Sequence, residues 1–579
     1  MDARRAQPLV LLLPAIVVAL ALDQGGFDPS AWVWAGALAA WAAGTAVVVH
    51  RDVRLPRGGR VWLAAACGLL VWVCLSWLWS DRRPQTVLEA RRSALYAAAV
   101  LALVVLTRQG AARRLLLLTH AAILAVVAYA LARYLIETRA IDPFEGTLLA
   151  QPLGYANALA ALAALGVVLG VGLAAGTGRP AARACLAGSV PLFAASLPLT
   201  HSRGAAVALG AGLAVVVLCA GDVSRLVRAA LVVVPGAALA AVVSATSRLG
   251  DAQATPRAHA ALSVGLATIV CALGTAIAAA RVGTASRATR APKRAVAGLL
   301  VLAVVAAGAA TGLTEPRASL WGVAWHAFRA NPAGGSGAGT FALAWARSGL
   351  VETRGGALDA HSLYLETLAE LGVVGLVVLL AFLVVPLARI RSLRTDTGAV
   401  AAGAYVVFLV HAGLDWDWEM PAVVLAGLCC GAAALACGDS PSRPLAPSGR
   451  ATVVALALAL GALSIAGARS SSEPGVAPQL PLAVLDARLA VIPVVVPAPV
   501  TFRLPVLLLR SGLGGAGRER VAVAQMRLDG LRGDGDQVPG VLLRVRAVAD
   551  LHAVLLARRA VLILRRGRAV LSARSLVLM

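Results

Sequence analysis

The chain has 579 residues, of which 60% are hydrophobic and only 14% charged, and its mean hydropathy is +0.82. A water-soluble domain has about 45–50% apolar and about 25% charged residues, so this composition excludes a soluble globular protein. The 52 Lys and Arg residues exceed the 28 Asp and Glu residues, which gives a formal net charge of +24. Most of these cations flank apolar runs, as topology signals do. We therefore predict a membrane protein and no nucleic-acid surface.

Fifteen apolar runs bounded by charge are candidate spans, because a helix needs ~20 residues to cross the hydrocarbon core. They are 8–22, 31–50, 61–79, 93–106, 115–136, 153–175, 184–199, 204–220, 229–245, 260–280, 296–313, 363–388, 399–414, 420–437 and 451–467. The first run lacks a small-residue cleavage site, so we expect an uncleaved anchor. The predicted fold class is all-α: a polytopic integral membrane helical bundle with about 13–15 transmembrane helices and a large extracytoplasmic loop.

The distribution of Lys and Arg predicts the orientation of these spans. Loops on the same side as the N-terminus carry 23 of these residues, and the opposite loops up to residue 419 carry 12. Because cytoplasmic loops are enriched in Lys and Arg, we expect the N-terminus in the cytoplasm. The predicted divisions are an N-terminal transmembrane bundle (1–313), an extracytoplasmic loop (314–362), C-terminal transmembrane helices (363–467) and a tail (468–579).

The tail differs in composition from the rest of the chain. It is rich in Pro, Gly and Arg, with 15 Arg against 6 Asp and Glu over residues 480–579. Arginine pairs interrupt its apolar stretches, so no span fits there. We expect a poorly ordered or locally β-like segment.

The long loop opens with a segment that predicts a helix at the membrane surface. Ala318, Trp321, Trp325 and Phe328 recur on one helical face, which would lie at headgroup depth. Asn331 precedes a proline and would end this helix. The glycine-rich segment 334–340 that follows leaves two interpretations open: backbone amides that converge on a phosphate, or a flexible linker.

Three residues on the predicted extracytoplasmic face are candidates for chemistry. His361 closes the long loop, and a neutral histidine there can accept a proton from a hydroxyl, although capping or packing is an open alternative. Arg203 and Arg317 both fall on this face, where topology disfavours cations. Two guanidiniums can bind a pyrophosphate, while the alternative is that they extend to lipid headgroups.

Several motifs together resemble one known family. They are Arg317-x-x-x-Trp321, Asn331-Pro-x-x-Gly-Ser-Gly-x-Gly-x-Phe341, Ala360-His361-Ser-x-Tyr364-Leu365-x-x-Leu368-x-Glu370-x-Gly372, Trp79-Ser80, Gly154-Tyr155-Ala156-Asn157-Ala158-Leu159-Ala160 and Ser202-Arg203-Gly204. They look like the bacterial O-antigen ligase and O-antigen polymerase family, over roughly residues 60–440. The segment 411–421, with Asp415, Asp417 and Glu419, resembles a variant in actinobacterial-type members.

The resemblance implies a GT-C-like fold and a specific chemistry. Members of the ligase branch transfer a glycan from undecaprenyl pyrophosphate to an acceptor hydroxyl, with inversion and without a metal. By match to the motifs, Arg203 and Arg317 would bind the pyrophosphate, and His361 would act on the acceptor hydroxyl. Further candidate contacts to the glycan or acceptor are Trp321, Gly335, Gly337, Tyr364, Glu366, Asp415 and Asp417. An ordinary acidic outer turn is the open alternative for the two aspartates.

The expected partners are a lipid-linked glycan donor and a glycan or lipid acceptor at the outer face of the cytoplasmic membrane. No cofactor and no metal are expected, and the eight cysteines, which lie in or beside apolar runs, show no metal-ligand spacing. Two other functions remain open. One is a repeat-unit polysaccharide polymerase of the same family, and the other is a lipid or polysaccharide transporter or flippase, which would place charged residues inside the spans.

Overall fold

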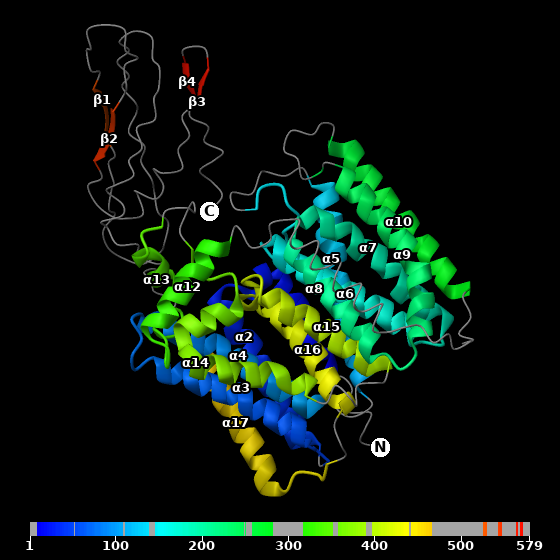
Figure 1. The fold of residues 1–579 in the computed structure, drawn as a ribbon, viewed down its shortest axis with the longest axis horizontal. Helices are drawn as coiled ribbons and strands as arrows, with labels where there is room; N and C mark the ends of the chain where they lie inside the picture. Colours follow the sequence, from blue (N-terminus) through cyan, green and yellow to red (C-terminus); the bar gives the residue numbers. More distant parts are fainter. Residues whose placement is uncertain are drawn as a thin grey trace, which may run out of the picture. The chain divides into compact units, whose positions relative to one another are not determined.

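The computed structural model describes residues 9–50, 52–107, 111–137, 145–247, 249, 257–281, 317–350, 357–388, 396–438 and 442–465, and, in the tail, 525–529, 542–546, 563–565 and 568–570. The chain divides into two units, Met1–Ser472 and Glu473–Met579. Among the described residues, the first unit carries the helices and the second carries four short strands (Figure 1).

Sixteen α-helices are described in the first unit. They are α1 (Leu12–Leu22), α2 (Pro29–Val49), α3 (Arg57–Ser76), α4 (Arg83–Leu106), α5 (Ala112–Ile136), α6 (Ala156–Ala175), α7 (Pro180–Thr200), α8 (Arg203–Cys219), α9 (Val223–Thr246), α10 (Arg257–Arg281), α12 (Ala318–Ala330), α13 (Phe341–Arg347), α14 (Leu363–Val384), α15 (Asp396–Ala412), α16 (Pro421–Gly438) and α17 (Pro447–Ile465). Four single-turn 3₁₀ helices accompany them: η2 (Leu9–Leu11), η3 (Gln24–Gly26), η5 (Val385–Leu387) and η6 (Asp417–Glu419).

The predicted polytopic helical class is confirmed. Ten of the described helices are long and apolar enough to cross a membrane, and α1, α8 and α15 are shorter apolar helices. Fourteen of the fifteen predicted spans coincide with a described helix, and the remaining run, 296–313, lies outside the described residues. The apolar periodicity and the charged boundaries therefore located these helices correctly.

The core of the first unit is built around α6 and α16. In the most apolar stretch of each of these two helices, 89% of the residues are buried inside the protein. In the most apolar stretch of α9, only 11% of the residues are buried. Both central helices are apolar on every face and rich in Ala and Gly, which allows helices to approach closely from all sides. In contrast, α9 and α10 pack together at one edge of the bundle and expose large aliphatic side chains (Figure 1).

Several hydrogen bonds join helix ends that the predicted topology places on the same side of the membrane. At one end of the bundle, Trp79 Nε1 donates to the Gly334 carbonyl at 3.2 Å, and the Leu149 amide donates to the Leu199 carbonyl. At the other end, an Arg54 guanidinium nitrogen donates to the Ser442 carbonyl at 2.8 Å. Every one of these contacts joins segments that the alternating orientation places on the same side.

The tail contains two antiparallel strand pairs. Strand β1 (Gln525–Asp529) pairs with β2 (Leu542–Arg546), with Gln525 opposite Arg546. Strand β3 (Ile563–Arg565) pairs with β4 (Arg568–Val570). The remaining residues of the predicted tail lie outside the described part of the chain.

Gly212 of α8 and Gly403 of α15 lie against each other where the two helices cross, and they provide a test of this packing. A Cβ on Gly403 would lie 2.3 Å from Val216 Cγ2 and 2.6 Å from the Gly212 carbonyl oxygen, whereas a Cβ on Gly274 of α10 would meet nothing within 4 Å. We expect Gly403→Ala to destabilise the protein by about 1–3 kcal/mol because two backbones must separate. Thermal unfolding in detergent measures this effect, with Gly274→Ala as the matched control. Equal melting temperatures for the two variants would contradict the close approach.

Candidate active site

The membrane helix α14 is broken near its middle, at Gly372. This residue has φ +66° and ψ −168°, so the helical hydrogen bonds are interrupted there. The glycine-rich loop supplies the missing partners: the Val373 amide donates to the Pro332 carbonyl at 2.9 Å, and the Gly337 amide donates to the Glu370 carbonyl at 2.8 Å. Trp72 Nε1 donates to the Leu371 carbonyl at 3.1 Å. Because unpaired backbone groups are costly in a membrane, these bonds fix the loop against α14.

The amides of the glycine-rich loop converge on a carboxylate of the protein itself. Glu370 Oε2 accepts from the Gly339 amide at 2.7 Å, and Glu370 Oε1 accepts from the Phe341 amide at 2.8 Å. Neither interpretation considered from the sequence is correct, because the segment is not a linker and its amides are not open to a phosphate. The physical reason is that an internal carboxylate from α14 occupies the position an external anion would take.

The helices that flank this loop form a small core of their own on α14. Leu320, Val323 and Ala324 of α12 are buried against Phe341 and Trp345 of the loop and α13. The predicted end of α12 is confirmed, because Asn331 follows its last residue. The other face of the helix carries Trp325, which is 50% exposed. The aromatic face predicted from the sequence is therefore divided, because Trp321 packs against this core and Trp325 is exposed.

Asp415 is the most strongly connected charged group of the site. The residue is 1% exposed, and its carboxylate lies 3.0 Å from an Arg317 guanidinium nitrogen. Tyr155 donates its hydroxyl to Asp415 Oδ1, and Asn157 Nδ2 donates to Asp415 Oδ2 at 2.7 Å. Burial, followed by the Asp415 charge, raises the pKa of Tyr155 well above its ordinary value. The phenol therefore stays protonated as a donor.

His361 lies beside this group and is paired with a carboxylate two residues before it. Its Nδ1 is 2.7 Å from Asp359 Oδ1, and its side chain is 30% exposed. Burial lowers the pKa of His361, but Asp359 and the charge of Asp415 raise it more, so the net pKa is above the ordinary 6.5 despite the opposing charge of Arg317. The backbone of His361 is left-handed, with φ +50°. Such a conformation in a non-glycine residue is typical of functional sites.

Arg203 begins α8 at the same end of the bundle. It is exposed and follows a helix end at which His201 is also left-handed, with φ +53°. A Cβ on the neighbouring Gly204 would lie 3.6 Å from His411 Nε2. The start of α8 therefore lies against the segment that carries His411 and Asp415.

A buried pair of His411 and Asp417 supports this arrangement, whereas the sequence pointed to Asp417 only as a candidate substrate contact. His411 Nδ1 lies 3.0 Å from Asp417 Oδ2, and both side chains are 0% exposed. The only sequence signal was a histidine and two aspartates within seven residues at the end of a span. That pattern could not distinguish an acidic outer turn from an internal pair, because only burial decides between them.

The sequence comparison agrees with this geometry. Residues 188–380 match the model of a protein family described as O-antigen ligase. Over these residues, about a third of the chain, the protein is similar to the O-antigen ligase family. Arg203, Arg317 and His361 all lie within the match, which supports a membrane glycosyltransferase of the O-antigen ligase and polymerase type. No curated protein matched the chain.

Most of the other residues predicted to contact substrate form close contacts or hydrogen bonds within the protein. Gly335 is buried against the Glu370 backbone, and Gly337 against Ser80. Tyr364 donates to the Leu409 carbonyl at 2.8 Å, which joins α14 to α15. Glu366 accepts from the Ala360 amide at 2.6 Å and so fixes the turn that carries His361.

The two aspartates also have partners within the protein, because Asp415 pairs with Arg317 and Asp417 pairs with His411. Of the predicted contacts, Trp321 is partly exposed on α12 and packs at the edge of the loop core. The internal residues thus position the site, because their polar atoms already have protein partners. Within the described residues, no group of three or more His, Cys, Asp and Glu side chains is arranged to hold a metal ion.

A further ion pair joins the turn after α15 to α4. Arg92 lies 3.1 Å from Glu419 Oε1 and also pairs with Glu89. Burial raises the pKa of Glu419 to about 7, although the charge of Arg92 lowers it. One arginine therefore compensates two partly buried carboxylates, and it joins the turn 415–419 to α4.

The Glu370 carboxylate allows the order of the glycine-rich loop to be tested. We expect Glu370→Ala to speed amide exchange in peptides covering residues 332–345 by roughly tenfold or more, because the Gly339 and Phe341 amides lose their acceptor. Hydrogen–deuterium exchange with mass spectrometry measures this. Glu137→Ala is the control, since Glu137 forms an exposed pair with Arg133. Unchanged protection of the loop in Glu370→Ala would show that the carboxylate does not order it.

Proposed function

We propose that the protein transfers a glycan from a polyprenyl pyrophosphate carrier, such as undecaprenyl pyrophosphate, to an acceptor hydroxyl at the extracytoplasmic face of the cytoplasmic membrane. The observation that carries this proposal is the placement of Arg317 and the His361–Asp359 pair around one buried carboxylate, Asp415. A cation for the leaving group and a base for the nucleophile are the two groups that glycan transfer needs from the protein, because the donor is already activated.

Arg317 and Arg203 would bind the pyrophosphate. Arg317 uses one guanidinium nitrogen for Asp415, at 3.0 Å, and a guanidinium carries five N–H donors. The bond to Asp415 thus fixes the orientation of the guanidinium that would bind the phosphate oxygens. Arg203, at the N-terminus of α8, adds a second guanidinium and the positive end of a helix dipole. Together they would stabilise the charge that develops on the departing pyrophosphate.

His361 would act as the general base. With Nδ1 directed at Asp359, Nε2 is the nitrogen that can accept the proton of the acceptor hydroxyl. As that proton moves to Nε2, the acceptor oxygen forms a bond to the anomeric carbon. The bond from this carbon to the pyrophosphate oxygen breaks, and the carrier lipid keeps the pyrophosphate. Asp359 stabilises the imidazolium that results.

The acceptor separates ligase from polymerase activity, and transport is less well supported. Attack by a lipid or cell-wall hydroxyl gives ligation, and attack by a second lipid-linked glycan gives polymerisation. A transporter requires polar groups along a pathway through the membrane. The ion pairs Arg92–Glu419 and Arg317–Asp415 instead lie at one end of the bundle, which favours chemistry at a surface.

Removing the three proposed groups tests the assignment. We expect Arg203→Ala, Arg317→Ala and His361→Ala each to lower glycan transfer by at least about 100-fold, because each loses a charge or a base used in the transition state. Transfer from a purified polyprenyl-pyrophosphate glycan in proteoliposomes measures the effect. His326→Ala and Arg329→Ala on α12 are matched controls, since both side chains are exposed. Wild-type rates in all three site variants would contradict the proposal.

The raised pKa of His361 predicts the pH dependence. A general base must be neutral, so transfer rises with pH through the pKa of His361, which lies above 6.5. Asp359→Asn removes the charge that raises this pKa, so the rising limb should move to lower pH, with a lower maximal rate. Initial rates between pH 5 and 9 measure both changes. A limb that stays in place would exclude the Asp359–His361 pair as the titrating unit.

A further inference from the structure

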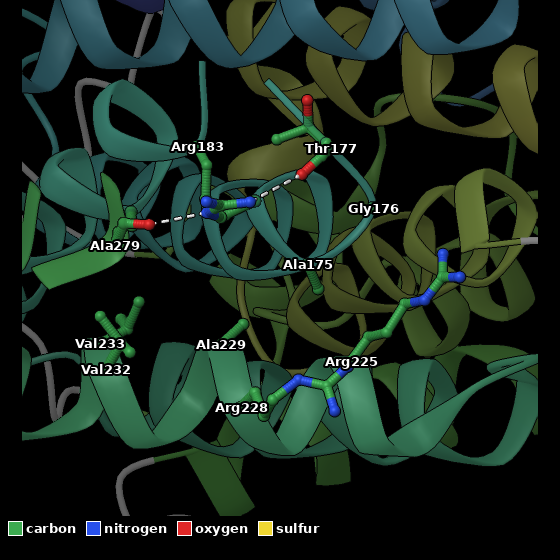
Figure 2. A pocket seen from close by; sticks show the side chains of 13 residues that line it. Ala175, Gly176, Thr177, Arg183, Arg225, Arg228, Ala229, Val232, Val233 and Ala279 are labelled. Carbon is green, nitrogen blue, oxygen red and sulfur yellow. Dashed lines mark hydrogen bonds between the residues drawn. The ribbon is translucent and has the colours of Figure 1, made fainter. Parts of the chain in front are cut away.

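A basic cavity of about 300 Å³ lies where α6, α7, α9 and α10 meet (Figure 2). It is at the opposite end of the bundle from the candidate active site. Helix α7 begins at Pro180 beside this cavity and ends at Thr200 next to the Arg203 turn, and its 21 residues span about 30 Å. The cavity is therefore separated from the active site by the thickness of a membrane.

Three arginines line this cavity, and no acidic residue is among its lining residues. Arg183 is held in place by backbone carbonyls: its Nε donates to Ala279 at 2.7 Å, and its terminal nitrogens donate to Thr177 and Ala280. Carbonyl acceptors orient a guanidinium without neutralising it. Arg183 thus presents a fixed positive charge to the cavity, as Figure 2 shows.

The other two arginines come from the first two turns of α9. Arg225 lies 3.3 Å from both Asp222 and Asp396, so its charge is shared with two carboxylates. Arg228, three residues further along the same helix face, has no ion-pair partner among the described residues. The N-termini of α7 and α9 add their positive dipole ends at this place. The cavity is built to receive an anion.

The inner wall of the cavity is apolar. Ala187, Val232 and Val233 line it beyond the arginines. On its outer side, α9 exposes Leu231 and Val234, which are 70% and 56% exposed, as expected of a face that contacts lipid. A ligand here would place an anionic group among the arginines and an apolar portion against the valines or the surrounding lipid. A phosphodiester headgroup with its acyl chains has this chemistry.

We propose that this cavity binds the phosphate group of an anionic membrane lipid in the leaflet opposite the active site. Basic pockets between transmembrane helices are suited to such headgroups, and paired guanidiniums bind phosphate through charge-assisted hydrogen bonds. The excess of Lys and Arg predicts that this end faces the cytoplasm. The site is independent of glycan transfer, because it shares no residue with the active site.

Native mass spectrometry of the full-length protein in detergent tests the proposal, with phosphatidylglycerol and phosphatidylcholine added as competing probes. We expect retention of phosphatidylglycerol, and an apparent Kd that rises roughly tenfold or more in Arg228→Gln, because a charge-assisted contact is lost. Arg60→Gln is the matched control, since Arg60 is an exposed cation at the same end of the bundle, on α3, outside the cavity. Thermal unfolding without lipid verifies that both variants fold.

The outcomes distinguish a lipid phosphate from a soluble phosphate ligand. Weaker phosphatidylglycerol binding in Arg228→Gln alone supports the lipid site. Equal weakening in Arg60→Gln would overturn it in favour of general surface attraction. Displacement of the lipid by millimolar glycerol phosphate or inorganic phosphate would overturn the lipid assignment and indicate a soluble phosphate ligand instead. Equal retention of both lipids by the wild-type protein would overturn the proposal entirely.

Discussion

The arrangement of the site depends on one buried carboxylate. Asp415 is almost inaccessible to solvent, and a carboxylate in such surroundings is stable only when it is paired and hydrogen-bonded. Its partners come from two separate parts of the chain: Arg317 at the start of α12, and Tyr155 and Asn157 at the start of α6. The need to compensate this charge therefore brings the start of α12 against the membrane bundle and orients the guanidinium proposed to bind pyrophosphate.

A second constraint acts on the backbone. The break in α14 at Gly372 leaves amide and carbonyl groups that lipid cannot satisfy. The glycine-rich loop pairs with them, and the Glu370 carboxylate binds two of its amides in return. Four residues further toward the N-terminus of the same helix, Glu366 binds the Ala360 amide beside His361. One face of α14 thus holds both the loop and the turn of the proposed base.

The sequence predicted much of the architecture, for a simple physical reason. Apolar runs of membrane-spanning length and their charged boundaries are local properties, so fourteen helices could be located without tertiary information. The end of α12 at Asn331 followed from the restriction that proline places on its predecessor. The family motifs identified Arg203, Arg317 and His361, whose chemistry is visible in their residue types.

Whether a polar residue faces substrate or the protein interior is not a local property. Asp417, Tyr364 and Glu366 have the chemistry of substrate contacts, yet their atoms are used by His411, Leu409 and Ala360. The glycine-rich segment has the composition of an anion site, and only the position of Glu370 shows that the anion is internal. By itself, the sequence determined that this is a helical membrane protein. The tertiary structure alone decided which polar side chains have partners inside the protein, because that depends on the distances and burial that packing creates.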